Sequence, residues 1–247
     1  MRRREFIAGL GGAAAWPLAA RAQQPAMPVI GCLINGSAMG SEYFLAPFRQ
    51  GLGDAGFVEG RNLVIEYRWA DGHNERLLAL ADGLVTMRVS VIAAIPGASA
   101  ALAAKRSTST IPIVFLTAGD AVELGLVTSL NKPDGNLTGV SGLINSLVTK
   151  QFGLLGELRT KTVSFALLTN PTSPNTNALV GSMQAAARAG GRELHVLSTG
   201  DEGELDAAFA TLSVRHVGGL IVPASSFFRT RRERVVALAA AHRIPTI

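Results

Sequence analysis

Five short stretches rich in small polar residues stand out because each directly follows a run of apolar residues. They are residues 35–40, 96–99, 117–120, 170–175 and 223–226. Hydroxyl groups and free backbone N–H groups can hold a small anion, such as a carboxylate, without a full positive charge. We expect Ser37 and Ser99 to hold such an anion, and Asp120 to take a cationic amine. The candidate binding residues are Ser37, Pro96, Gly97, Ser99, Thr117, Asp120, Asn170, Asn175, Ser225 and Ser226. The alternative is that these stretches are ordinary turns.

Residues for catalysis or metal binding do not assemble in the same way. The sequence has no Gly-x-Ser-x-Gly motif of a serine hydrolase and no Gly-x-x-x-x-Gly-Lys-Ser/Thr motif of a P-loop. The histidines are His73, His195, His216 and His242, and none stands at ligand spacing from another histidine, cysteine or carboxylate. We therefore expect a protein that is not an enzyme and needs no metal or cofactor.

A glycine-rich stretch, Gly51-Leu52-Gly53-Asp54-Ala55-Gly56, matches the dinucleotide-binding fingerprint letter for letter. That fingerprint must follow a strand and open a helix, so that the helix N-terminus faces the pyrophosphate. Here the glycines close a helical pattern and lead into a strand. We expect a helix end and not a nucleotide site.

Two charged clusters have simple structural explanations. Acidic residues at 201–204 precede a helix and favour its dipole. The basic run at 229–234 contains Glu233 and has no interleaved aromatic residues, so we interpret it as a solvated helix face. The basic net charge of +5 arises mainly from Arg2, Arg3, Arg4 and Arg21 at the N-terminus. We expect no nucleic-acid partner.

The binding loops require strands that end beside them and helices that begin there. Apolar runs predict strands at 29–34, 62–69, 89–95, 112–116, 136–141, 163–168, 193–197 and 217–222, and the start of one at 244–247. Apolar residues at helical spacing predict helices at 41–55, 74–87, 149–158, 177–189, 204–212 and 231–241, with another beginning at 100–106. Such alternation is typical of parallel sheets covered by helices on both faces.

The two halves of the chain repeat one pattern. The strand at 29–34 and the helix end at 54–56 align with 163–168 and 188–190 at the same offset, and Ile95-Pro96-Gly97-Ala98-Ser99 resembles Val222-Pro223-Ala224-Ser225-Ser226. An internal repeat of this kind predicts an α/β protein with two Rossmann-like lobes, each built on a parallel sheet. The first half continues well beyond its strand at 112–116, whereas the sequence stops at Ile247 inside the equivalent strand. We therefore expect the second lobe to be incomplete.

The strand at 136–141 lies between the two copies of the repeat, after a predicted turn at 133–135. It marks the crossover from the first lobe, at 29–141, to the second, at 142–247. Hinge motions use a few residues of such connections. The candidate hinge residues are Thr138, Gly139, Val140 and Ser141.

The N-terminus has the features of an export signal. Paired arginines precede Phe6-Ile7, an apolar segment runs from 8 to 20, and Ala20-Arg21-Ala22 fits signal peptidase. The pattern resembles a twin-arginine signal, with Arg2 where serine or threonine is usual. We expect residues 1–22 to be removed near Ala22, residues 23–28 to form a linker, and the mature protein to be periplasmic without stable membrane insertion. Cys32 is the only cysteine, and we expect it to be buried in a strand and not a lipid attachment site.

Longer stretches resemble the periplasmic solute-binding proteins of ABC transporters, and among them the family related to tryptophan-binding components. The resemblance lies in Gly56-Phe57-Val58-Glu59-Gly60-Arg61-Asn62, Ile65-Glu66-Tyr67-Arg68-Trp69, Gly119-Asp120-Ala121-Val122-Glu123-Leu124-Gly125-Leu126-Val127 and Gly135-Asn136-Leu137-Thr138-Gly139-Val140-Ser141, and in 48–52, 101–105, 111–115, 170–175 and 237–240. It implies the type I periplasmic-binding fold, a small, amino-acid-like ligand in the cleft between the lobes, closure about a hinge, and delivery to an ABC permease in the inner membrane.

The leading hypothesis is therefore an exported solute-binding component of an ABC importer. One alternative is a ligand-sensing domain of a regulator with the same fold, although an export signal stands where a DNA-binding segment would be expected. A second is a periplasmic enzyme, which would need a catalytic constellation that the sequence does not supply. The last is a non-functional truncated fragment.

Overall fold

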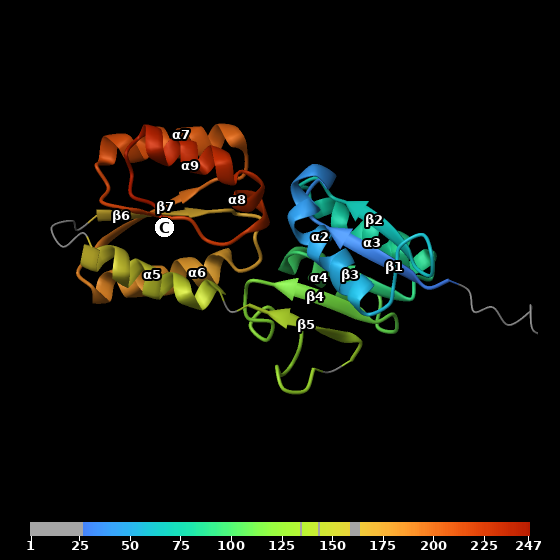
Figure 1. The fold of residues 1–247 in the computed structure, drawn as a ribbon. Helices are drawn as coiled ribbons and strands as arrows, with labels where there is room; N and C mark the ends of the chain where they lie inside the picture. Colours follow the sequence, from blue (N-terminus) through green and yellow to red (C-terminus); the bar gives the residue numbers. More distant parts are fainter. Residues whose placement is uncertain (1–26, 134, 143, 159–163) are drawn as a thin grey trace, which may run out of the picture.

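The computed structural model describes residues 27–133, 135–142, 144–158 and 164–247. The expected export signal and residues 23–26 of the expected linker lie outside these residues. The chain forms two α/β lobes that lie side by side (Figure 1). Within the described residues, no helix is long and apolar enough to cross a membrane.

The first lobe is built on a five-stranded parallel sheet with the strand order β2-β1-β3-β4-β5. Its strands are β1 (Val29–Ile34), β2 (Val64–Trp69), β3 (Val91–Ala94), β4 (Ile113–Thr117) and β5 (Leu137–Ser141). Its helices are α2 (Ala38–Asp54), the short 3₁₀ helix η1 (Asn74–Arg76) that leads into α3 (Leu77–Thr86), and α4 (Ala98–Ser107).

Side chains alternate across this sheet and bury both of its faces. In β1, Cys32 and Ile34 pack with Leu45 of α2, while Leu33 points to the opposite face and packs with α3 and α4. Such a strand, buried on both sides, reads as a continuous apolar run, which is why the sequence identified it. Cys32 is fully buried, as expected, and burial raises the pKa of its thiol to about 12.

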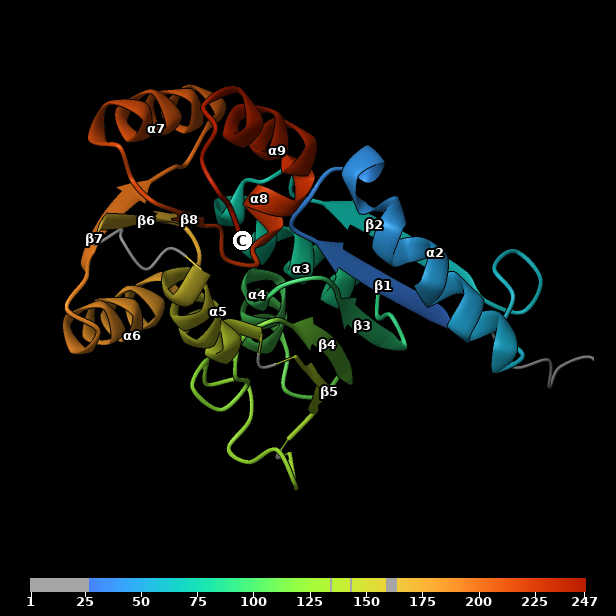
Figure 2. The same ribbon diagram turned by 60° about the vertical axis from the view of Figure 1, so that its left-hand side comes forward.

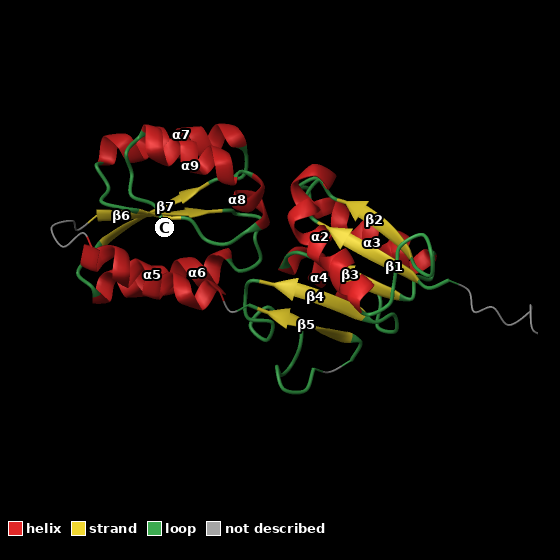
Figure 3. Cartoon of the chain, viewed as in Figure 1, coloured by secondary structure: helices red, strands yellow, loops and turns green. Residues whose placement is uncertain are grey.

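The second lobe has a three-stranded parallel sheet with the strand order β7-β6-β8. Its strands are β6 (Ser164–Thr169), β7 (Glu193–Ser198) and β8 (Leu220–Ile221). Helices α5 (Ile144–Leu158) and α6 (Thr176–Ala189) cover one face, and α7 (Glu202–Arg215), α8 (Ser226–Thr230) and α9 (Arg232–Ala241) lie on the other side (Figure 3). Strands β1 and β6, which the repeat aligned, have the same burial pattern. The prediction of two Rossmann-like lobes with parallel sheets is confirmed.

The structure differs from the sequence-based elements most clearly in the second lobe, where the strand expected to begin at 244–247 is only an isolated bridge between Thr246 and Leu220. Helix α5 begins at Ile144 and not at 149, because Val148 belongs to the same buried stripe as Phe152 and Leu155. Strand β8 is only Leu220–Ile221, because only these residues pair with β6. Helix α8 was not predicted; the Ser225 hydroxyl starts it by accepting a hydrogen bond from Phe228 N at 3.3 Å.

The glycine-rich stretch at 51–56 forms a helix end, as expected. Helix α2 ends at Asp54, and Phe57 N donates to Leu52 O at 2.8 Å in the six-residue loop typical of a helix C-terminus. Gly56 has a φ of +87°, a conformation that glycine adopts readily. These glycines therefore close the helix and present no helix N-terminus to a nucleotide.

Candidate functional site

A cavity of about 430 Å³ lies between the two lobes, which is within the size range of small-molecule sites. The strands of the first lobe point their carboxyl ends toward the second lobe (Figure 3). Loops that follow β1, β2, β3, β4, β6 and β8 line the cavity, and Figure 2 gives a second view of the two lobes. Ligands of parallel α/β sheets bind at this edge, because helix N-termini and free backbone groups meet there.

The structure brings all but one of the predicted binding residues to this cavity. Those that line it are Ser37, Pro96, Gly97, Ser99, Thr117, Asn170, Asn175, Ser225 and Ser226. Asp120 does not line it. Its carboxylate accepts hydrogen bonds from Val122 N at 2.7 Å and from Glu123 N at 3.3 Å, so a local turn uses this side chain. Asp120 is therefore no candidate for binding an amine in this cavity.

Most hydroxyl groups in the cavity wall already have hydrogen-bond partners, among them Thr172, Ser173 and Thr230, which donate within their own lobe. Those of Thr117 and Ser225 accept hydrogen bonds from backbone N–H groups of their own loops. The Ser37 hydroxyl likewise accepts from Gly40 N at the start of α2, at 3.4 Å. By contrast, the side chains of Ser99 and Ser226 make no hydrogen bond with any described residue and lie on opposite lobes. These two hydroxyls are therefore free to bind a ligand.

The N-terminus of α4 opens onto the same cavity. Its N-cap is Gly97, which has no side chain to satisfy the first backbone N–H groups of the helix. Gly97 has a φ of +110°, and a Cβ atom added there would lie 3.2 Å from Ser226 Oγ of the other lobe. The glycine thus allows the two lobes to approach while the helix N-terminus faces the cavity, where a negative group is favoured.

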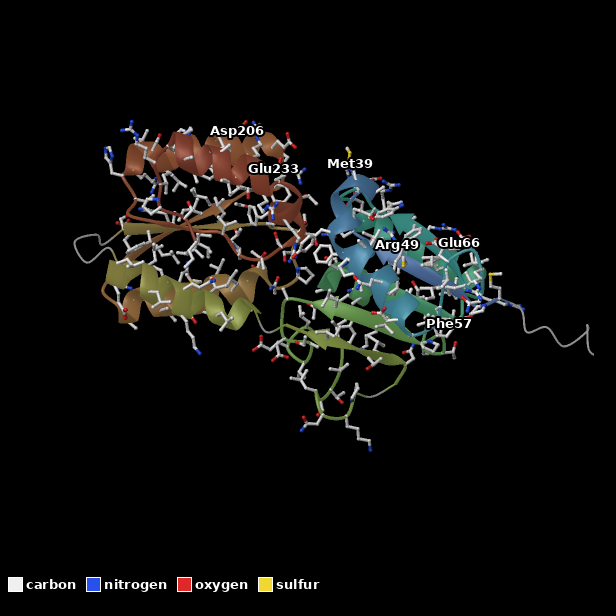
Figure 4. All side chains as sticks on the ribbon, viewed as in Figure 1. Met39, Arg49, Phe57, Glu66, Asp206 and Glu233 are labelled. Carbon is white, nitrogen blue, oxygen red and sulfur yellow. The ribbon has the colours of Figure 1, made fainter. Side chains whose placement is uncertain are left out.

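Contacts of several kinds between described residues join the lobes across the cavity. Asn74 Nδ2 donates a hydrogen bond to Thr172 O at 2.9 Å. The Arg229 guanidinium lies over the ring of Phe44, 4.6 Å from its centroid. Gly97 approaches Ser226, and Gly40 approaches Thr230. The side chains of both lobes meet between α2 and α8 (Figure 4), so the lobes contact each other directly in this structure.

Several cavity residues were missed by the sequence analysis. They are Phe44, Asn74, Glu202, Phe227, Arg229 and Arg231. The signal that could have found Phe227 and Arg229 is that Ser225-Ser226-Phe227-Phe228-Arg229 continues directly from a predicted binding loop. Phe44 lies nearly two turns inside α2, and nothing in the periodicity of that helix indicates that its ring faces another lobe.

The interpretation of the basic run at 229–234 as a solvated helix face is incomplete for two of its arginines, because Arg229 is exposed and Arg231 half-buried where they face the cavity. Arg229 and Arg231 line the cavity, and Arg231 lies over the ring of Phe227 at 4.3 Å. Partial burial lowers the pKa of Arg229, although the nearby Tyr43 hydroxyl acts in the opposite direction. Arg234 does face outward, where its guanidinium donates to Asp206 Oδ2 at 2.6 Å.

The acidic cluster at 201–204 has two roles and not one. The Asp201 carboxylate caps α7 by accepting from Glu204 N at 2.8 Å, as the dipole argument expected. Glu202 also lines the cavity, and its carboxylate lies 3.6 Å from Arg231 Nε. In the part of the chain that the structure describes, no group of histidine, cysteine and carboxylate side chains is arranged to hold a metal ion.

The candidate hinge residues lie in β5 and not in a free connection. Residues 138–141 pair in register with β4, and the Ser141 hydroxyl donates to Gly119 O at 2.8 Å. Gly142 N donates to Thr117 O at 2.8 Å, and Gly142 lines the cavity. The strand is thus fixed to the first lobe up to its last residue, and a hinge motion would occur after it.

Comparisons with known proteins agree with this geometry. The model of the family described as ABC transporter substrate binding protein matches residues 31–247. The tyrosine-binding protein of Clostridioides difficile is 28% identical over 200 residues, which are 81% of this chain and 57% of that protein. The chain therefore spans a little over half of the length of this curated relative.

Solved structures show the same fold. A conserved domain protein from Vibrio cholerae superposes with a TM-score of 0.79 at 22% identity, over 89% of this chain and 73% of that one. The ABC domain in complex with L-Trp from Streptococcus pneumonia superposes with a TM-score of 0.76 at 19% identity, over 90% of this chain and 73% of that one. At these identities the likeness establishes the fold and not the ligand.

Proposed function

The chain belongs to the family of ABC transporter substrate-binding proteins, and we propose that it captures a small organic carboxylate of amino-acid size between its lobes. The observation that carries this proposal is the cavity of about 430 Å³ lined by loops of both lobes. A ligand held there contacts both lobes at once and therefore stabilises the closed form over any open form. The family is one of solute-binding proteins and not of enzymes.

The polar groups of the cavity support a carboxylate as the recognised group. Ser99 and Ser226 offer free hydroxyl donors from opposite lobes, and the uncapped N-terminus of α4 offers backbone N–H groups. Hydrogen bonds to a charged acceptor contribute about 1.5–3 kcal/mol each, which is more than neutral ones contribute. The rings of Phe44 and Phe227 supply apolar surface for the body of the ligand.

We further propose that the protein is exported to the periplasm and delivers its ligand to an ABC permease of the inner membrane. The twin-arginine pattern at the N-terminus and the family membership support this assignment. The closed form would dock on the permease, and the motion between open and closed forms would occur after β5, whose residues Thr138, Gly139, Val140 and Ser141 hold the connection to the first lobe.

A thermal-shift screen of the purified protein against amino acids and small aromatic carboxylates tests the binding function. A compound present at 100 times its Kd stabilises the folded state by about 2.7 kcal/mol. For a chain of this length that raises Tm by roughly 5–10 °C. If the protein unfolds cooperatively and no compound raises its Tm, the proposed function is wrong.

A double serine variant tests whether a compound that binds does so in this cavity. Replacing both Ser99 and Ser226 with alanine removes the two free hydroxyls and is expected to weaken binding by about tenfold or more. Ser213→Ala is the matched control, because Ser213 lies exposed on α7 and bonds only to Ala210 O of its own helix, at 2.7 Å. Equal affinity in the double variant and the control would contradict the site.

A further inference from the structure

Among the described residues, two acidic and two basic side chains line the inter-lobe cavity, and one of the basic ones is unpaired. They are Asp71, Glu202, Arg229 and Arg231. Arg76 Nη1 lies 2.9 Å from Asp71 Oδ2, so this carboxylate already has a cationic partner. Glu202 and Arg231 form a second pair at 3.6 Å. After these pairs are formed, one charge remains in the cavity wall, and it is positive.

That remaining charge is Arg229. Its guanidinium makes no hydrogen bond or ion pair with any described residue, and its one direct partner is the ring of Phe44. A guanidinium stacked on a ring keeps its N–H edge free, and that edge can bind both oxygens of a carboxylate. The N-terminus of α4, on the other lobe, favours negative charge in the same cavity.

An ammonium group would find no unpaired anion among the described residues, because the two carboxylates of the cavity wall, Asp71 and Glu202, already face Arg76 and Arg231. Asp120, the carboxylate that the sequence suggested for this role, lies outside the cavity wall. The carboxamide oxygens of Asn35 and Asn74 have no hydrogen-bond partner, but both atoms are fully buried and so out of reach of a ligand. An ammonium taken from water without an anionic partner is strongly disfavoured.

We propose that the cavity selects small, ring-bearing monocarboxylates without an ammonium group over zwitterionic amino acids, and that Arg229 determines this preference. This inference rests on the proposed binding function and specifies its ligand class. The ring-bearing body follows from Phe44 and Phe227, whose side chains line the cavity. Arg229 binds the carboxylate from the second lobe, while Ser99 and the α4 N-terminus bind it from the first.

A series of ligands that share a phenyl ring and differ in their charged groups tests the inference on the unmodified protein. The probes are 3-phenylpropionate, L-phenylalanine and 2-phenylethylamine, which share a ring and a two-carbon spacing and are an anion, a zwitterion and a cation. Calorimetric titration is expected to give a Kd for 3-phenylpropionate at least about tenfold lower than that for L-phenylalanine, and no binding of 2-phenylethylamine.

Two arginine variants then locate the effect. Arg229→Met keeps an unbranched side chain over Phe44 without the charge. It is expected to weaken the binding of 3-phenylpropionate roughly 10- to 100-fold. Arg234→Met removes a charge of the same kind from the same segment, but Arg234 lies outside the cavity wall and pairs with Asp206. The affinity of this variant for 3-phenylpropionate should therefore equal that of the wild type.

The outcomes separate the inference from the function on which it rests. Binding of L-phenylalanine that equals or exceeds binding of 3-phenylpropionate overturns the preference and leaves the binding function standing. Equal weakening by Arg229→Met and Arg234→Met overturns the role of Arg229. If no aromatic carboxylate and no amino acid binds at all, the proposed function fails together with the inference.

Discussion

Gly97 is the position where the local backbone and the approach of the two lobes can be tested with one substitution. Its φ of +110° and ψ of +151° lie in a region that is almost exclusive to glycine. Gly97→Ala forces a side chain into that region, at a cost of about 1–3 kcal/mol. For a chain of this length such a loss lowers Tm by roughly 2–12 °C.

The same substitution also affects the contact between the lobes. The added Cβ atom would lie 3.2 Å from Ser226 Oγ, so the Ser226 side chain must move by a few tenths of an ångström or rotate away. Adding Ser226→Ala removes the atom in contact but leaves the backbone strain. The double variant is therefore expected to keep the low Tm of Gly97→Ala.

Calorimetry or circular dichroism at a series of temperatures measures these effects, with Gly51→Ala as the control. Gly51 lies in α2 with no atom near its added Cβ, so alanine there should raise the stability by about 0.4–1 kcal/mol. A Tm of Gly97→Ala equal to that of the wild type would refute the backbone argument. Full recovery of Tm in the double variant would show that the contact, and not the backbone, causes the loss.

Three further predictions concern closure, the buried thiol and export. Asn74→Leu removes the hydrogen bond to Thr172 O, and titration calorimetry should show ligand affinity lower by about 2- to 10-fold; unchanged affinity would mean that this bond does not stabilise the closed form. Burial raises the pKa of the Cys32 thiol from 9.0 to about 12 in the folded protein. Above pH 9 the thiol ionises more readily in the unfolded chain, so the free energy of unfolding falls as the pH rises from 9 toward 12. Denaturation at a series of pH values should show that the free energy of unfolding falls less above pH 9 in Cys32→Ala than in the wild type. An equal fall in both proteins would contradict the raised pKa of Cys32. Replacing Arg3 and Arg4 with lysine should stop export through the twin-arginine route, measured by cell fractionation; unchanged periplasmic protein would contradict that route.

Much of the fold could be predicted because local sequence and burial agree. Residues 29–34 form an uninterrupted apolar run because β1 is buried on both faces, and its equivalent β6 carries the same pattern. The loops that line the cavity were recognisable because small polar residues follow such strands, and chain direction places those ends at one edge of a sheet. The repeat then implied that two such edges face each other.

The parts that could not be predicted depend on how one lobe is oriented relative to the other. Phe44 projects from a helix whose periodicity only indicates which side faces its own sheet. Arg229 comes from a short helix that depends on the cap of Ser225, and its stacking partner lies far away in the sequence. Asp120 was predicted to bind an amine, but a carboxylate that follows a strand can instead accept hydrogen bonds from the backbone of its own turn, as it does from Val122 N.

The distance between the lobes, with and without ligand, tests the central claim most directly. Spin labels can be placed at cysteines introduced for Met39, which is 95% exposed, and Glu233, which lie on different lobes (Figure 4). Cys32 stays unlabelled because it is buried with a raised pKa. With the compound that raises Tm most, pulsed electron paramagnetic resonance should show one narrow, short distance, and without it a longer and broader distribution. The same distribution in both samples, despite a raised Tm, would contradict closure of the lobes on the ligand.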